Sequence, residues 1–251
     1  MTSIDAYLER IGASRESTLA ELQHRHLLRV PFENLSIHLG EEIVLEPDAL
    51  LSKIVDRHRG GFCYELNGAF ATLLTGLGHH VELLQARVLT PEGPGIPYDH
   101  LALRVDGEFL VDVGFGAFSH YPLRIGELGD QADPAGTFRI EETGEGDLEI
   151  LLDGQPEYRL ELRPRRLPDF TAGSWWHQTS PKSHFTRQVI CSKLTEHGRI
   201  SLSGSETLIR TLLDGTKTTE PLVGDEAVLA AYREHFSIEV TEVPTARANT
   251  W

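Results

Sequence analysis

Apolar residues recur every three or four positions through most of the first eighty residues of the chain. This spacing is that of one face of an α-helix, and four stretches carry it. Ser17 and Pro47 are plausible start signals for two of them, and Gly12 and Gly78 are plausible stops. We therefore predict helices over Ile4–Ile11, Ser17–Val30, Pro47–Arg57 and Tyr64–Leu77.

The pattern changes at Val81, where apolar and polar residues begin to alternate in short stretches. Alternation with period two is typical of half-buried strands, and pairs such as Asp106-Gly107, Thr143-Gly144 and Asp153-Gly154 supply turns between them. The predicted strands are Val81–Leu89, His100–Val105, Glu108–Val113, Thr137–Glu141, Leu148–Leu152 and Tyr158–Leu162. Strands joined by short turns favour an antiparallel sheet or a small barrel.

The last third of the chain mixes the two periodicities. After Pro168 we expect a Trp-rich loop, then further strands, and a helix near Asp225–His235. The strands expected here are Phe185–Leu194, Arg199–Ser203 and Leu208–Leu213. Helices first, strands next and a mixed end place the chain in the α+β class.

One of the two cysteines lies between a glycine pair and a predicted helix, in Arg59-Gly-Gly-Phe-Cys63-Tyr-Glu65-Leu-Asn67. At a helix start, the unpaired N–H groups and the positive end of the helix dipole favour the thiolate, which is the nucleophilic form. The glycines let the backbone turn sharply and leave room beside the sulfur. Cys63 is therefore a candidate nucleophile. The alternative is a small buried thiol that fills a gap.

A nucleophilic cysteine needs a base, and the base needs a group that orients it. His100 begins a predicted strand, and the run from there to Asp112 has the pattern of a hairpin. A two-residue turn would mix polar and apolar residues on both faces, whereas a three-residue loop over residues 105–107 makes one face uniformly apolar. Because the buried face sets the register, we predict the second arrangement, which pairs Arg104 with Glu108 and His100 with Asp112.

The composition limits the cellular location and the kinds of partner that we expect. The formal net charge of −15 over 251 residues argues against nucleic acid and anionic membranes as partners. The basic run Arg163-Pro-Arg-Arg166 is either a solvated face or a local phosphate-binding patch. No apolar run reaches the roughly 20 residues that span a bilayer, and the start of the chain shows no secretion signal. Two cysteines indicate neither a disulfide framework nor a zinc site, so we expect a cytoplasmic protein without a metal.

These residues resemble the arylamine N-acetyltransferase family. The stretch around Cys63 is similar to its active-site signature, His100-Leu-Ala-Leu-Arg-Val to its catalytic-histidine strand, and Asp112-Val-Gly-Phe-Gly to its catalytic-aspartate strand and glycine loop. Pro31-Phe-Glu-Asn-Leu and Gln178-Thr-Ser-Pro-Lys-Ser-His-Phe are further matches. The five motifs run in the family's order over nearly the whole chain.

The resemblance implies three parts: a helical domain over residues 1–80 with the nucleophile, a β-barrel domain over 81–184 with the histidine and aspartate, and an α/β lid over 185–251. It also implies a ping-pong reaction of xenobiotic metabolism. Cys63 would take an acetyl group from the co-substrate acetyl-CoA and pass it to the amine of an arylamine or arylhydrazine. His100 would then be the base and Asp112 the group that orients it.

Further roles follow from the same resemblance. Phe32 and Phe115 match positions that line the acceptor pocket. Trp176, Ser180 and Ser183 match positions where the lid approaches coenzyme A. For each of these residues an ordinary structural role is the alternative, and assembly into a homo-oligomer is left open.

Three other functions stay open at this stage. Some proteins that resemble this family act as amide synthases on larger acyl thioesters in secondary metabolism, and the short loops of this chain would suit a bulky donor. The same triad could instead hydrolyse a thioester, as in thiol peptidases. A scaffold of this kind could also bind small molecules without catalysis. Two observations would distinguish these functions: which donor acylates Cys63, and whether water reaches the thioester.

Overall fold

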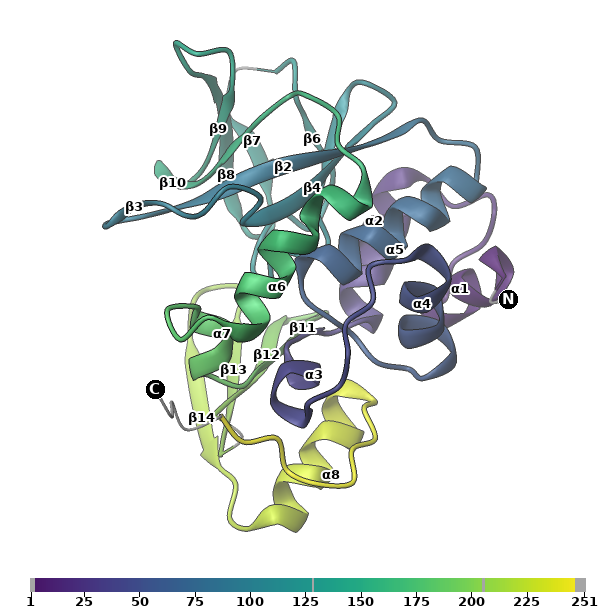
Figure 1. Ribbon diagram of the computed structural model, residues 1–251, viewed down its shortest axis with the longest axis vertical. Helices are drawn as coiled ribbons and strands as arrows, with labels where there is room; N and C mark the ends of the chain where they lie inside the picture. The colour runs from purple at the N-terminus through teal and green to yellow at the C-terminus, as the bar shows by residue number, and fades with distance from the viewer. Residues whose placement is uncertain (1–2, 128, 205, 247–251) are drawn as a thin grey trace.

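A computed structural model of the chain describes residues 3–127, 129–204 and 206–246. Figure 1 shows a large sheet at the top, a group of helices at the right, and a smaller sheet with α8 at the bottom. The helices are α1 (Ile4–Ile11), α2 (Leu19–Arg29), α3 (Leu35–Leu39), α4 (Pro47–Leu51), α5 (Cys63–Gly76), α6 (Thr171–Thr179), α7 (His184–Arg187) and α8 (Asp225–Phe236), with a π-helical turn over Ser52–Asp56 and a 3₁₀ turn over Leu167–Phe170. The strands are β1 (Phe32–Glu33), β2 (Val81–Thr90), β3 (Gly93–Pro94), β4 (His100–Val105), β5 (Phe109–Val111), β6 (Leu123–Arg124), β7 (Gln131–Asp133), β8 (Gly136–Glu142), β9 (Leu148–Leu152), β10 (Gln155–Leu160), β11 (Ile190–Thr195), β12 (Gly198–Ser203), β13 (Thr207–Leu212) and β14 (Lys217–Pro221).

The large sheet is an antiparallel, nearly closed barrel. Its strand order is β6-β5-β4-β2-β10-β9-β8-β7, with β3 paired to β2. The two end strands meet through a side chain: Gln131 of β7 donates to the carbonyl oxygen of Arg124 in β6 (3.0 Å) and accepts from its backbone N–H (2.8 Å). Leu84, Phe138 and Tyr158 belong to the buried cluster of this sheet. The predicted α+β class, with a central antiparallel barrel, is confirmed.

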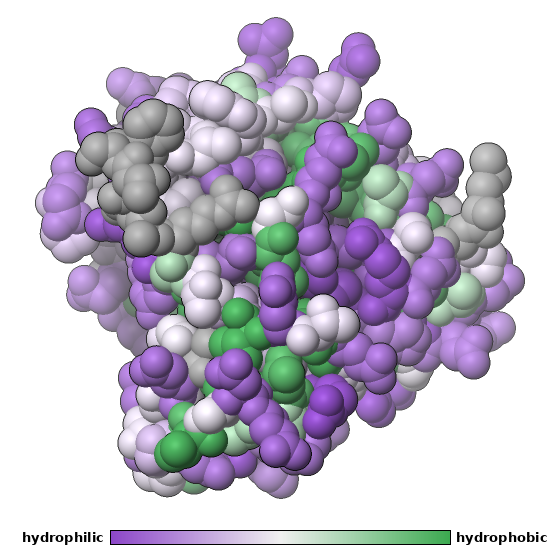
Figure 2. All heavy atoms as spheres, turned by 60° about the horizontal axis from the view of Figure 1, so that its bottom comes forward, coloured by the Kyte–Doolittle hydropathy of each residue, from purple (hydrophilic) through white to green (hydrophobic). Residues whose placement is uncertain are grey.

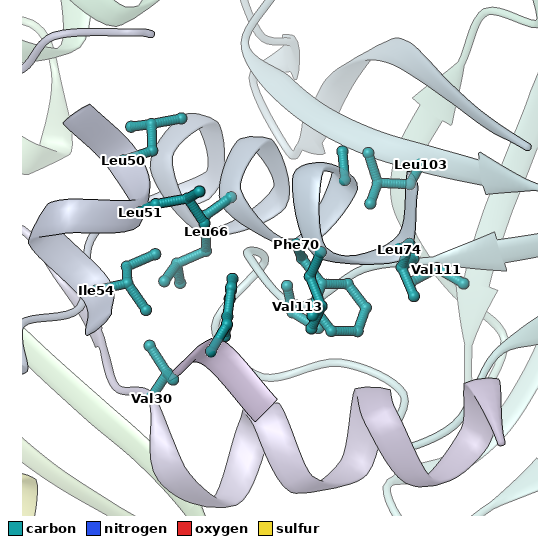
Figure 3. Close-up of a cluster of buried hydrophobic side chains, with 14 of the residues drawn as sticks. Val30, Leu50, Leu51, Ile54, Leu66, Phe70, Leu74, Leu103, Val111 and Val113 are labelled. Carbon is teal, nitrogen blue, oxygen red and sulfur yellow. The ribbon is translucent and has the colours of Figure 1, made fainter. Parts of the chain in front are cut away.

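Helix α5 is enclosed along most of its length, which fixes the position of its first residue. Its apolar side chains, among them Leu66, Phe70 and Leu74, belong to the largest buried cluster. Figure 3 shows them between Leu50, Leu51 and Ile54 on one side and Leu103 and Val111 on the other. Burial of each Leu or Phe contributes about 1.5–3 kcal/mol. A shift of the helix along its axis would lose several of these contacts together.

The smaller sheet joins the end of the chain to a strand near its start. Its order is β1-β11-β12-β13-β14. In the first pair, Phe32 faces Ser192 and Glu33 faces Cys191. Helix α8 contributes Tyr232 and Phe236 to a third buried cluster. The smaller sheet is therefore hydrogen-bonded to the segment that leads to the nucleophile.

The four predicted N-terminal helices are present, although the end of the third is a π-helical turn. Two predictions for the last third were wrong. The Trp-rich loop is helix α6, which long-range contacts hold in place: a Cβ on Gly173 would lie 2.4 Å from the Tyr98 carbonyl oxygen. Residues 185–189 do not extend the next strand, because the side chain of Ser183 accepts a hydrogen bond from Phe185 N (3.2 Å) and starts α7.

The predicted register of the β4–β5 hairpin was wrong by two residues. Val105 faces Phe109, so the loop comprises Asp106, Gly107 and Glu108. Asp106 and Gly107 both have positive φ, 54° and 72°, and Glu108 N donates to Val105 O (3.1 Å). The tight turn therefore leaves Glu108 out of the β4–β5 pairing, although the predicted register had paired it with Arg104.

The shift of two residues changes the partners but not the faces, because side chains alternate with period two. Arg104 forms its ion pair with Glu82 on β2 and not with Glu108. Asp112 follows β5 and is displaced from the position directly opposite His100. Both side chains remain on the same side of the sheet, and diagonal neighbours on one face are within reach.

Candidate active site

Cys63 is the first residue of α5, and Phe62 is its N-cap. The Glu65 side chain accepts a hydrogen bond from Phe62 N (3.2 Å), which satisfies one of the free N–H groups of the helix start. A Cβ on Gly61 would lie 2.7 Å from Glu65 Cβ, and one on Gly114 would lie 2.7 Å from Cys63 Cα. The backbone at Gly114 thus lies close to Cys63. Cys63 itself is only 4% exposed.

His100 opens β4, and its Nε2 donates to Asp112 Oδ2 over 2.6 Å. This leaves Nδ1 for the thiol, and Cys63 is close enough to hydrogen-bond the ring. Burial disfavours the charged imidazole, but the Asp112 carboxylate and then Cys63 outweigh it and raise the pKa of His100 to about 10. The ring is therefore protonated at neutral pH, and an imidazolium beside a sulfur stabilises its thiolate form.

Asp112 is buried and bonded on both oxygens. Oδ2 accepts from His100 and from the Tyr158 hydroxyl (3.3 Å). Oδ1 accepts from Asn67 Nδ2 (2.8 Å) and Gly114 N (2.9 Å). Burial and then the Asp112 charge raise the pKa of Tyr158 well above its usual range, so its hydroxyl remains a donor. A buried carboxylate with these partners is held in one orientation.

Asn67 connects the helix of the nucleophile to the hairpin. It lies one turn after Cys63, and its Nδ2 donates to Leu101 O (2.6 Å) as well as to Asp112. Its Oδ1 accepts from Val113 N (2.9 Å). One amide therefore holds α5 against β4 and against the segment after β5. Distances between these elements depend on it.

A buried cluster of charges braces the turn before Cys63. Arg59 pairs with Glu33 (3.0 Å) and Glu41 (3.1 Å), and Lys53 pairs with Glu65 (2.6 Å). Burial opposes ionisation of Glu33, but Arg59 and Lys53 lower its pKa to about 2. Removal of one member would leave a buried charge without its partner, which is strongly destabilising.

Phe32 and Phe115, the residues expected to line an acceptor pocket, are both partly exposed. The ring of Phe115 meets that of His100 edge-on, with 5.1 Å between centroids. Phe32 forms a bridge with Gly61, two residues before Cys63. The ring of Phe115 thus contacts the triad directly, whereas the backbone of Phe32 pairs with the segment that leads to Cys63.

The three residues expected to approach coenzyme A differ in how far they are buried. Trp176 is half-buried, with its ring edge-on to His177 at 5.0 Å. Ser180 is also half-buried. Ser183 is buried, and its hydroxyl accepts from Phe185 N (3.2 Å) and lies 3.1 Å from His177 Nδ1. Its oxygen is therefore already engaged inside the protein.

Asp99, His177 and Ser183 form a second hydrogen-bonded series beside the triad. His177 Nε2 lies 3.0 Å from Asp99 Oδ1, and the other oxygen of Asp99 accepts from Val88 N (3.2 Å). Ser183 is only 1% exposed. The series ties the α6–α7 segment to Asp99, the residue before His100.

Sequence reasoning missed several of these contributors. Tyr158 has the alternating pattern of a core aromatic, and nothing nearby marks it as a donor to Asp112. Asp99 and His177 are far apart in sequence, so their contact had no local signal. Gly114 lay within a recognised motif, but only the structure shows that its missing side chain makes room for Cys63.

A thiol at a helix start, an imidazole beside it and a carboxylate behind the ring define a cysteine-dependent acyl-transfer or hydrolytic site. Within the described ranges, no group of three or more His, Cys, Asp or Glu side chains is arranged to hold a metal ion. None of the helices described is long and apolar enough to cross a membrane.

Comparisons with known proteins narrow this class to one family. A family model described as N-acetyltransferase matches residues 17–244. The chain is 33% identical to the arylamine N-acetyltransferase of Mycolicibacterium smegmatis, over 96% of this chain and 93% of that one. It is 37% identical to the Gallus gallus arylamine N-acetyltransferase, pineal gland isozyme NAT-3, over 80% and 81%.

Solved structures agree with these matches. The arylamine N-acetyltransferase from M. tuberculosis has a TM-score of 0.84 to this chain at 32% identity, covering 94% of this chain and 93% of that one. The Mycobacterium marinum arylamine N-acetyltransferase in complex with CoA has a TM-score of 0.85 at 30% identity, with the same coverage. The chain belongs to the arylamine N-acetyltransferase family, and it is an acyltransferase.

Proposed function

We propose that this chain transfers an acetyl group from acetyl-CoA, through a thioester on Cys63, to the amine of an arylamine or arylhydrazine. The observation that carries the proposal is the placement of Cys63 at the start of α5 beside His100, whose Nε2 is held by Asp112 at 2.6 Å. Family membership and the coenzyme A complex of the M. marinum relative support acetyl-CoA as the donor.

In the first half-reaction the Cys63 thiolate attacks the carbonyl carbon of the acetyl thioester. The new C–S bond forms while the carbonyl oxygen becomes an oxyanion, for which the backbone N–H of Cys63 is a candidate donor. The oxyanion then collapses, and the bond to the coenzyme A sulfur breaks. His100 gives its proton to that sulfur, so free coenzyme A leaves as a thiol and the acetyl group stays on Cys63.

In the second half-reaction the neutral amine attacks the Cys63 thioester. The neutral imidazole of His100 takes the proton that the amine loses as its N–C bond forms. The Cys63 sulfur leaves as a thiolate, which restores the starting ion pair. Asp112 keeps the ring in one orientation through both steps and stabilises its charged form, because Tyr158, Asn67 and Gly114 N hold the carboxylate in place.

The acceptor would enter between the two partly exposed aromatic side chains. Phe115 lies against His100, and Phe32 lies beside the glycine pair before Cys63. Flat aromatic rings stack or meet edge-on with Phe at 4.5–7 Å between centroids in general. An arylamine in this position presents its amine to the thioester while its ring stays against the two Phe side chains.

The setting that fits this reaction is the cytoplasm, where acetyl-CoA is available and thiols stay reduced. Both cysteines are free and buried, which suits that location. Small molecules are the partners that the proposal requires. Equal activity of a monomer and of any homo-oligomer, separated by gel filtration, would show that assembly is not needed for the reaction.

The proposal is tested by separating the two half-reactions. Mixed with acetyl-CoA and no amine, the protein should release free coenzyme A in a rapid burst of about one equivalent per chain, as a ping-pong enzyme does. Addition of an aniline should then restart the release and yield the acetylated amine. Continuous release without amine would instead indicate a hydrolase. A burst seen only with larger acyl thioesters would indicate an amide synthase.

A further inference from the structure

Five residues other than glycine have a positive φ in the described part of the chain, and one of them is unlike the rest. Four are polar and exposed: His58, Asp106, Asp153 and Ser237. Hydrophilic residues of this kind predominate on the face shown in Figure 2. Tyr98, with a φ of 59°, is instead half-buried. A bulky side chain at positive φ is an outlier, whereas Asp and His are several-fold enriched there.

The surroundings of Tyr98 hold its backbone in this conformation. Its N–H donates to Oε1 of Gln85 in β2 (2.8 Å), and its carbonyl oxygen accepts from the Tyr64 hydroxyl (2.7 Å). The same carbonyl oxygen lies against α6, because a Cβ on Gly173 would be 2.4 Å from it. Strained backbone persists only where neighbouring groups hold it, and such residues cluster at active sites.

Tyr64 connects the strained residue to the nucleophile. It follows Cys63 in α5 and is fully buried. Its hydroxyl reaches two successive carbonyl oxygens, that of Tyr98 at 2.7 Å and that of Asp99 at 3.0 Å. Burial, followed by the charges of Cys63 and Asp99, raises the pKa of Tyr64 well above its usual range. The hydroxyl therefore keeps its proton and remains a donor.

Helix α5 thus holds the chain on both sides of His100. Tyr64 bonds the two carbonyl groups before the histidine, and Asn67 bonds the carbonyl group of Leu101 after it (2.6 Å). Because φ and ψ are the only soft dihedrals of the backbone, a switch of residue 98 to negative φ would turn its carbonyl group away from Tyr64. The start of β4, and His100 with it, would then move relative to Cys63.

We propose that Tyr64 is a positioning residue of this enzyme: its hydroxyl holds Tyr98 at positive φ and so keeps His100 beside the Cys63 sulfur. The inference rests on the proposed function, in which His100 exchanges a proton with both substrates and therefore has to lie within hydrogen-bond reach of the reacting atoms. The ring of Tyr64 packs edge-on against Phe62, with 5.0 Å between centroids, as the ring of an ordinary core residue would. A test must therefore separate the hydroxyl from the ring.

Tyr64→Phe removes the hydroxyl and keeps the ring. A left-handed conformation disfavours a residue with a Cβ by about 5- to 30-fold, so the single-turnover rate of Cys63 acetylation should fall by about that factor. The Kd of coenzyme A, measured by calorimetry, should be unchanged, because the hydroxyl is bonded inside the protein. Tyr7→Phe is the matched control. It removes a buried hydroxyl that lies 3.2 Å from His26 Nδ1 and should leave the rate unchanged.

Substitutions at residue 98 test the strain itself. Tyr98→Gly and Tyr98→Ala both remove the ring, which lies 5.4 Å from that of Phe170 between centroids. Glycine adopts positive φ as readily as negative φ and alanine does not, so the glycine variant should acetylate Cys63 about 5- to 30-fold faster than the alanine variant. At a residue with negative φ, alanine would be the better replacement. Tyr98→Asn, which tolerates positive φ, should lie between the two and gives a second comparison with alanine if the glycine variant does not fold.

A double variant decides whether the hydroxyl acts through Tyr98. In the Tyr98→Gly background, Tyr64→Phe should lower the acetylation rate by less than about threefold, because glycine does not have to be held at positive φ. A loss of about 5- to 30-fold in both backgrounds would overturn the proposal, since Tyr64 would then act by another route. An alanine variant at residue 98 that is as fast as the glycine variant would also overturn it.

Alkylation of Cys63 gives a readout that does not depend on acetyl transfer. Iodoacetamide at pH 6 reacts with the thiolate, which a neighbouring imidazolium stabilises. Tyr64→Phe should slow this reaction by about 5- to 30-fold, measured on the Cys63 peptide by mass spectrometry, and Tyr7→Phe should not. Because Tyr64→Phe preserves the shape of the side chain, this arm also remains available if a variant at residue 98 fails to fold.

The two readouts distinguish a failure of the positioning role from a failure of the proposed function. If acetyl-CoA does not acetylate the wild type, but alkylation of Cys63 slows in Tyr64→Phe, the proposed acetyl transfer is wrong and the positioning role stands. Acetylation and alkylation of Cys63 at equal rates in wild type and Tyr64→Phe would give the reverse result.

Discussion

The two cysteines of this chain show how different environments change the same thiol. Both are buried: Cys63 is 4% exposed and Cys191 is 0% exposed. Cys191 lies within β11, and burial, followed by the charge of Glu33, raises its pKa well above the usual range. Cys63 lies at a helix start beside a protonated His100. Exposure therefore does not separate a reactive thiol from a structural one, whereas a helix terminus and a neighbouring base do.

The largest difference between the two thiols should appear on replacement by serine. A hydroxyl is far less acidic than a thiol, so Cys63→Ser should lower kcat by at least about 10³-fold. Cys191→Ser should keep most of the activity and should lower the free energy of unfolding, because it puts a hydroxyl in a buried apolar site. Steady-state kinetics and urea unfolding measure both. Comparable losses of activity in the two variants would contradict the assignment of Cys63.

The next comparison removes the charge behind the base. Asp112→Asn keeps the shape of the side chain but places a neutral amide against His100 Nε2 and against the amide of Asn67. We expect kcat to fall by roughly 10³-fold, because the imidazolium loses its partner and its fixed orientation. Circular dichroism should show an intact fold. A loss of less than about tenfold would mean that Asp112 does not orient the base.

The raised pKa of His100 also links the site to stability. Its pKa is about 10 in the folded protein, against an ordinary value of 6.5. A group that binds its proton more tightly when folded stabilises the protein fully below its unfolded pKa, and this contribution is lost as the pH rises through the folded pKa. The difference in free energy of unfolding between wild type and His100→Gln should therefore fall between pH 6.5 and about 10. Urea unfolding at stepped pH tests this, and a constant difference would argue against a protonated ring.

A smaller effect is expected from the hydrogen-bonded series behind the triad. His177→Ala removes the partner of Asp99 and Ser183, which frees the segment before His100. We expect kcat to fall by about 5- to 20-fold with little change in KM for the donor, since each lost hydrogen bond contributes about 1 kcal/mol. His177→Gln, which keeps one donor, should recover part of the loss. His184→Ala, at an exposed neighbour, is the control and should behave as wild type.

The smallest effect should come from Tyr158→Phe. The hydroxyl donates to Asp112 over 3.3 Å, and three other donors remain on that carboxylate. A long hydrogen bond of this kind contributes about 1 kcal/mol, so kcat should fall by roughly two- to fivefold. Stopped-flow acylation rates resolve such a change. A fall of more than about 100-fold would show that the hydroxyl takes part in proton transfer.

Much of the triad followed from local rules in the sequence. A glycine pair before a helix marked Cys63, and alternation along one hairpin placed His100 and Asp112 on one face. The hairpin register itself was wrong by two residues, because positive φ at Asp106 and Gly107 moved the turn. The prediction that His100 and Asp112 share one face was still right, because a shift of two residues keeps every side chain on the same face of the sheet.

Contacts between distant segments could not be foreseen in the same way. Helix α6 has a weak periodic pattern and is held by contacts of Gly173 and His177 with residues 98 and 99. The pattern of a single sequence predicts the local secondary structure and which face of each element is buried. It does not predict which distant elements pack against one another.

The central claim is that Cys63 alone carries the acetyl group, and its most direct measurement is a peptide map of the acid-quenched protein. The chain is mixed with acetyl-CoA in the absence of amine, quenched in acid, digested and analysed by mass spectrometry. We predict one acetyl group per chain on the peptide that contains Cys63, none on the peptide that contains Cys191, and loss of the label when an aniline is added before the quench. A label on Cys191, or one on Cys63 that an aniline does not remove, would contradict the account.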